Sequence, residues 1–77
     1  MSHDEAEQVE ISTDVIRLGQ LLKFAGAADS GAEAAAIIGA GDVRVDGEVE
    51  TRRGRQLARG SRVEVDLPEG VRVLDVV

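Results

Sequence analysis

The chain has 77 residues, 43% of them hydrophobic and 1% aromatic, and a formal net charge of −6. A chain of this length forms one domain with a small core, which leaves no room for a catalytic cleft and the residues that support it. It has no cysteine and one histidine, His3 in a polar segment, so we expect no catalytic residue, no metal site and no cofactor.

Hydropathy and charge patterning indicate where the protein is located and where its charges lie. No apolar run approaches the roughly 20 residues that span a bilayer, and the first residues lack the layout of a secretory signal. This predicts a cytoplasmic protein without membrane contact. Residues 1–16 sum to −5, residues 17–62 to +2 and residues 63–77 to −3, so the middle of an acidic chain is basic.

The first residues are polar, acidic and without hydrophobic period. We therefore predict an acidic flexible tail over residues 1–11 and a single domain over residues 12–77. A short side-chain oxygen can cap the first helix, and the candidates are Ser12, Thr13 and Asp14. Apolar residues at helical spacing then form one stripe, made of Leu18, Leu21, Leu22 and Ala25. Gly26 is expected to end this helix.

A second helix has a clearer start. Ser30 and Glu33 match the S-x-x-E capping box, in which each side chain accepts from the other's backbone amide. The expected buried face consists of Ala34, Ile37 and Ile38, and Gly41 is expected to end the helix. Two short helices joined by a few residues should pack as a pair.

After Gly41 the hydrophobic period changes to two, which predicts strands. Val43 and Val45 alternate with polar residues, and Asp46-Gly47 is typical of a two-residue hairpin turn. Further strands are expected over residues 48–51, 61–67 and 71–77. The fold class is therefore α+β, with two N-terminal helices packed on a small, mostly antiparallel sheet of about four short strands.

Several candidate sites favour a structural interpretation. The acids around the hairpin should lie on its solvent face or in the turn, which argues against catalysis; they are Asp42, Asp46, Glu48 and Glu50. A Gly-x-Gly at Gly39–Gly41 follows a helix, whereas a phosphate-binding turn follows a strand. Phe24 lies near the stripe of the first helix, so we expect it in the core rather than as a surface for base stacking.

The segment Thr51–Arg62 holds five of the nine basic residues and no acid. As a loop between strands it would project its arginines outward, where their planar guanidinium groups match phosphate oxygens. The alternative is a solvated loop whose arginines pair with Glu48 and Glu50. Arg17, Lys23 and Arg44 could extend the basic surface if their elements adjoin it. With almost no aromatic residue, the chain would recognise phosphates and shape rather than stack bases.

The order of these motifs resembles the S-four RNA-binding domain, named for protein four of the small ribosomal subunit. That family begins with an Arg-Leu-x-x-x-Leu helix, similar here to Arg17, Leu18 and Leu22. A serine-capped second helix follows, and then Gly-x-Val-x-Val-Asn-Gly, similar to Gly41–Gly47 with Asp in place of Asn. The resemblance covers roughly residues 15–67 and is closest to small stand-alone bacterial members.

The resemblance implies the helix-pair arrangement called the alpha-L motif and binding of structured RNA. One departure is that Gly31 stands where the family commonly has an RNA-facing arginine. Our hypothesis is a non-catalytic, monomeric module that binds ribosomal or transfer RNA, with a ribosomal subunit as one candidate partner. The expected RNA-binding residues are Arg17, Lys23, Ser30, Arg44, Arg52, Arg53, Arg55 and Arg59. Two alternatives remain: a protein-interaction module that docks on an acidic partner, and an accessory subunit of an RNA-modifying enzyme.

Overall fold

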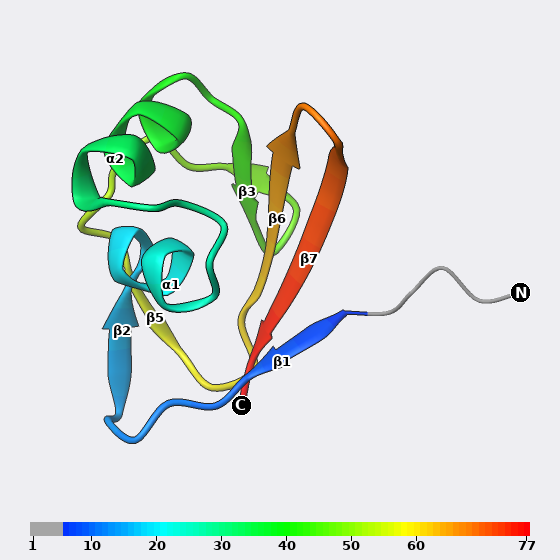
Figure 1. The fold of residues 1–77 in the computed structure, drawn as a ribbon. Helices are drawn as coiled ribbons and strands as arrows, with labels where there is room; N and C mark the ends of the chain where they lie inside the picture. The colour runs from blue at the N-terminus through cyan, green and yellow to red at the C-terminus, as the bar shows by residue number, and fades with distance from the viewer. Residues whose placement is uncertain (1–5) are drawn as a thin grey trace, which may run out of the picture.

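The structure is a computed structural model that describes residues 6–77. Two helices, α1 (Leu18–Phe24) and α2 (Gly31–Gly39), pack as a pair beside a twisted sheet (Figure 1). The strands in chain order are β1 (Glu7–Val9), β2 (Val15–Arg17), β3 (Val43–Val45), β4 (Glu48–Val49), β5 (Gln56–Ala58), β6 (Arg62–Leu67) and β7 (Gly70–Val76). Neither described helix has the length and apolar character needed to traverse a bilayer.

The strands form two separate sheets. The larger has the order β1-β7-β6-β3-β4, and the smaller pairs β2 with β5. Every pair is antiparallel except β1 with β7. The predicted α+β class with a mostly antiparallel sheet is therefore confirmed, but the described chain has seven strands rather than about four.

The helices are not N-terminal, because β1 and β2 precede them. Val9 and Ile11 are buried, and the Ile11 amide donates to the Val77 carbonyl over 3.1 Å. The prediction of a flexible tail is thus wrong for residues 7–11, which belong to the sheet and core. Residues 1–5 lie outside the described residues, so the tail prediction stays a prediction there.

The first helix begins later than its sequence suggests. Residues 15–17 pair with β5, so their backbone is extended and α1 starts at Leu18 instead of after Ser12, Thr13 or Asp14. The stripe is confirmed, since Leu18, Leu21 and Leu22 are fully buried. Gly26 follows the helix with a φ of 75°, the left-handed conformation that favours glycine at a helix end.

Helix α2 and the following hairpin agree closely with prediction. The Ser30 side chain accepts from the Glu33 amide over 3.1 Å, whereas the Glu33 carboxylate accepts from the amide of Asp29 instead of Ser30. Asp46 and Gly47 have φ values of 50° and 91°, as the predicted turn requires.

The core lies between the helix pair and one face of the larger sheet. Alternation along β3 and β6 directs apolar side chains inward, and these are Val43, Val45, Val63 and Val65. The prediction that Phe24 joins this core is wrong, because its side chain is 67% exposed. At 3.6 residues per turn, Phe24 lies about 60° beyond Leu21, at the edge of the stripe, and therefore leaves it.

Candidate nucleic-acid interface

The segment between β4 and β5 is anchored by one buried carboxylate. Glu50 is 7% exposed, and its amide donates to the Val43 carbonyl over 2.9 Å. Its side chain accepts from the Arg52 amide and Nε, each at 3.0 Å, and from Arg55 Nη1 at 2.8 Å. The prediction that Glu50 faces solvent is therefore wrong, and the alternative that loop arginines pair with it holds for Arg52 and Arg55.

These hydrogen bonds fix the charge of the carboxylate. Side-chain donation by Arg52 and then by Arg55, followed by the Arg52 amide, lowers the pKa of Glu50 from 4.5 to about 2. Glu50 is thus ionised at neutral pH and draws two guanidinium groups to one side of the segment. Arg53, which lies between them in the sequence, forms no hydrogen bond with Glu50.

The same segment caps the start of α1. The amides of Leu18 and Gly19 donate to the carbonyls of Arg55 and Arg53 over 2.8 and 2.9 Å. Amides in the first turn of a helix have no partner within the helix, so these two bonds tie the segment to α1. A Cβ atom at Gly19 would lie 3.5 Å from the Cβ of Arg53, which shows how closely the two backbones approach.

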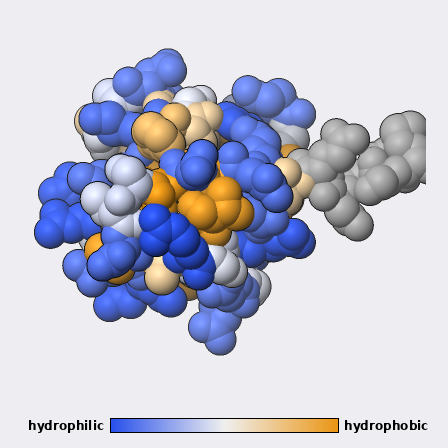
Figure 2. Space-filling view, turned by 90° about the horizontal axis from the view of Figure 1, so that it is seen from below, coloured by the Kyte–Doolittle hydropathy of each residue, from blue (hydrophilic) through white to orange (hydrophobic). Residues whose placement is uncertain are grey.

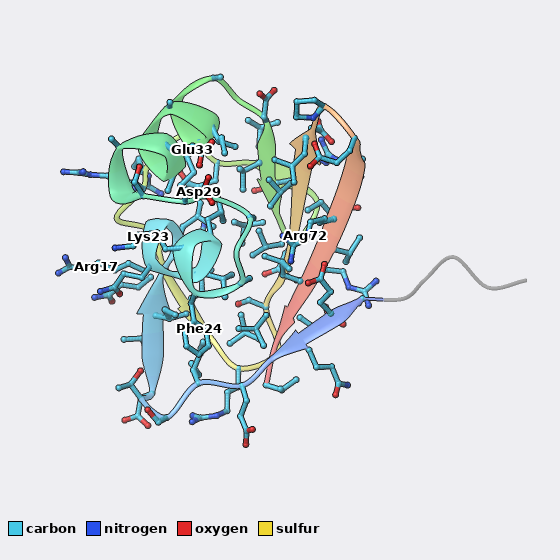
Figure 3. All side chains as sticks on the ribbon, in the orientation of Figure 1. Arg17, Lys23, Phe24, Asp29, Glu33 and Arg72 are labelled. Atoms are coloured by element: carbon cyan, nitrogen blue, oxygen red, sulfur yellow. The ribbon has the colours of Figure 1, made fainter. Side chains whose placement is uncertain are left out.

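A shallow groove of about 250 Å³ lies where α1, the start of α2 and this segment meet. We call it the cationic groove; it is lined by Arg17, Gly19, Gln20, Lys23, Gly31, Arg53 and Gly54. Arg17 and Lys23 point to the same side of the molecule, away from the larger sheet (Figure 3). Residues from three parts of the chain thus bring three positive charges together.

All nine basic residues lie in the described part of the chain. Within it, the side chains of Arg17, Lys23 and Arg53 form neither an ion pair nor a hydrogen bond. The remaining basic side chains have partners; they are Arg44, Arg52, Arg55, Arg59, Arg62 and Arg72. The three unpartnered cations are the same three that line the cationic groove, so this groove is the surface best suited to an anion.

Several residues predicted from the sequence lie elsewhere. Arg44 is on the face of the sheet away from the helices, where it contacts Glu64 and Asp66 at 3.1 Å each. This contact lowers the pKa of Asp66. Arg59 donates to the Ile11 carbonyl over 2.7 Å. The five arginines of Thr51–Arg62 therefore do not converge, and of them only Arg53 lines the groove.

The remaining expected residue, Ser30, acts as the N-cap of α2 directly beside the groove. Sequence reasoning missed Gln20 and the glycines that make room for the groove. Gly31 has no atom within 4 Å of the position a Cβ would occupy. The density of arginines in the sequence indicated a basic segment. It could not indicate that Arg52 and Arg55 pair with Glu50 while Arg53 does not, because no local pattern identifies Glu50 as buried.

Two comparisons with known proteins identify the family of the chain. The S4 domain family, the S-four domain of the sequence resemblance, matches residues 9–74. The chain is also 39% identical over 61 residues to the probable ribosome maturation protein RlbA of Bacillus subtilis (strain 168), covering 79% of this chain and 86% of that protein. Since both matches span most of the chain, the protein is a member of the S4 domain family.

Proposed function

We propose that the chain is a non-catalytic RNA-binding protein that recognises structured RNA, acting as a monomer. The observation that carries this proposal is the cationic groove, in which Arg17, Lys23 and Arg53 lack partners among the described residues. Bringing three like charges together is unfavourable without a counter-ion, and a phosphate backbone supplies anions at regular spacing. Membership of the S4 domain family supports the same function.

The relative supports a proposal about the class of RNA. RlbA is described as a probable ribosome maturation protein, which favours ribosomal RNA over transfer RNA as the proposed ligand. Arg52 and Arg55 form a second group of contacts. Their side chains are 74% and 40% exposed although both pair with Glu50, so each can share a guanidinium face with a phosphate. Arg44 and Arg59 are left out of the proposed interface.

The test is binding of a fluorescently labelled ribosomal RNA fragment at low salt. Arg53→Gln should weaken binding about fivefold, as expected for roughly 1 kcal/mol from one phosphate contact. Arg62→Gln is the matched control, because Arg62 pairs with Asp75 over 2.8 Å outside the groove. Equal affinity of the wild type and Arg53→Gln, or no RNA binding at low salt, would contradict the proposal.

A protein partner is the competing outcome. A tagged chain captured from a lysate with and without nuclease separates the two functions. RNA binding predicts that ribosomal components are lost after nuclease treatment. A partner retained after nuclease, and released by Arg53→Gln, would instead indicate docking on an acidic protein.

A further inference from the structure

The one aromatic side chain of the protein lies on its surface. Phe24 is the last residue of α1 and is 67% exposed, although a buried position was expected from its place near the stripe. In Figure 3 it points from α1 toward the lower face of the molecule, and the view of that face in Figure 2 shows apolar surface in the middle of hydrophilic residues. An exposed ring contributes little to the core, and apolar surface of this kind often marks a binding site.

Phe24 forms one wall of a second groove of about 450 Å³. We call it the apolar groove; it is lined by Thr13, Val15, Ile16, Gln20, Lys23 and Phe24. Val15 is 43% exposed and Ile16 is partly buried, so a planar apolar group placed here would contact the ring and two branched side chains.

The apolar groove adjoins the cationic groove. Gln20 and Lys23 line both, and Arg17 follows directly after Ile16 in β2. The side-chain oxygen of Gln20 accepts from the Arg17 amide over 3.2 Å, which leaves its NH₂ group available as a donor between the grooves. A ligand that combines an anion with an adjoining flat ring therefore fits across the boundary.

The charges around Phe24 also favour one direction from which a nucleotide would approach the ring. A further hollow bordered by Phe24 is lined by Glu10 and, among residues 6–77, by no basic residue, although the guanidinium of Arg59 is held at its edge by the Ile11 carbonyl. Phosphates near that hollow would meet a carboxylate and one arginine that is already hydrogen-bonded, whereas phosphates on the opposite side meet the unpartnered Lys23 and Arg53. The charge distribution thus favours a nucleotide that enters from the cationic groove.

We propose that Phe24 stacks on one unpaired base of the bound RNA while the adjoining phosphates lie along Lys23, Arg17 and Arg53. This inference rests on the proposed function, because it assumes that the cationic groove holds RNA. A base in a continuous duplex is stacked on its neighbours and cannot reach the ring, so the apolar groove selects RNA with a bulge, a loop or an end. Every base offers a π face, so the contact tolerates different sequences.

The affinity test uses two RNA hairpins that differ by a bulge of unpaired adenosines. Phe24→Leu keeps an apolar side chain and removes the aromatic face. It should weaken binding of the bulged hairpin about fivefold to tenfold, the low end of the range for loss of one stacked base, and change binding of the fully paired hairpin less than about twofold. Phe24→Trp should keep or improve the preference for the bulge.

A spectroscopic test is available because the chain has no Trp and no Tyr. The indole of Phe24→Trp would be the sole tryptophan, and stacking on a base should quench its fluorescence with the bulged hairpin but not with the paired one. Val71→Trp is the matched control, since Val71 is 55% exposed and lies in β7 beside the β6–β7 turn. Its fluorescence should change with neither RNA.

The outcomes separate this inference from the proposed function. If Arg53→Gln weakens both hairpins while Phe24→Leu weakens neither, RNA binding stands and the stacking proposal is overturned. An equal loss for both hairpins in Phe24→Leu would also overturn it, since stacking predicts a difference. If the wild type self-associates and Phe24→Leu does not, with RNA affinity unchanged, the apolar groove is occupied by a second copy and the proposal is wrong.

Discussion

At the level of single residues, Glu50 decides which arginines are available. Its carboxylate accepts hydrogen bonds from Arg52 and Arg55. Arg53 lies between these two residues in the sequence. A buried anion with two cationic partners is costly to remove, because both guanidinium groups would lose their acceptor. Glu50 therefore holds Arg52 and Arg55, whereas Arg53 lines the cationic groove.

The pKa of Glu50 predicts how stability depends on pH. Its pKa falls from 4.5 to about 2 on folding, so the ionised form stabilises the native state above pH 4.5 and that contribution is lost as the pH falls toward 2. Glu50→Gln should be less stable at neutral pH and show a flatter decline in acid. Arg44 and Arg62 also lower the pKa of Asp66 and Asp75, so part of the acid dependence should remain.

Urea unfolding followed by circular dichroism at a series of pH values measures this effect. The difference in the free energy of unfolding between the wild type and Glu50→Gln should shrink as the pH falls from 4.5 toward 2. A constant difference from neutral pH to pH 2 would show that Glu50 acts by packing alone.

A substitution at Gly31 should strengthen RNA binding at the cationic groove. Its φ is not positive and no atom lies within 4 Å of the place that a Cβ atom would take, so an arginine fits at the first position of α2 without strain. Gly31→Arg should tighten RNA binding by about 1 kcal/mol, or roughly fivefold, at low salt. Gly39→Arg is the control, because Gly39 is equally open at the other end of α2 and adds the same charge away from the groove. Equal gains in both variants would indicate a general charge effect.

At the level of elements, sequence patterns predicted the parts with strong local signals. The cap of α2, the hairpin at Asp46-Gly47 and the long strands β6 and β7 follow from side-chain oxygens, tolerance of positive φ and alternation along the chain. Strands β1, β2 and β5 were not predicted, because none of them has the apolar-polar-apolar order that Val43–Val45 shows. Each exists only because of a partner distant in sequence, as in the pairing of Glu7 with Leu74.

The cap of α2 can be tested directly. Ser30→Ala leaves the Glu33 amide without its acceptor and should lower the free energy of unfolding by about 1 kcal/mol. Ser30→Asp restores an acceptor and should recover most of the loss. Thermal unfolding at neutral pH measures both variants, and an unchanged Ser30→Ala would show that water replaces the cap at no cost.

The contribution of the N-terminal segment has its own test. Ile11 is 6% exposed and packs in the core, so Ile11→Ala should lower the free energy of unfolding by about 2 kcal/mol or more. Val71→Ala, at a residue that is 55% exposed, should change it by less than about 0.5 kcal/mol. If the two variants unfold alike in urea, residues 7–11 do not hold the place in the core that the structure gives them.

At the level of the whole molecule, net charge and local charge have opposite signs. Six basic side chains are held by carboxylates or carbonyls, and the three others share one groove, so a protein of charge −6 presents a small cationic surface. The sequence predicted the family, the helix pair and a basic interface. It could not identify the groove, because that depends on which arginines find a partner after folding.

The salt dependence of RNA affinity is the sharpest test of the cationic groove as the RNA-binding surface. With about five phosphates contacted, three by the cationic groove and two by Arg52 and Arg55, the slope of log affinity against log salt should be roughly −3.5 to −4.5 for the wild type. Removing two of the three groove cations in Arg17→Gln/Arg53→Gln should reduce the slope to roughly −2 to −3, while Arg62→Gln should leave it unchanged. A double variant with the slope and affinity of the wild type would contradict the role of the groove.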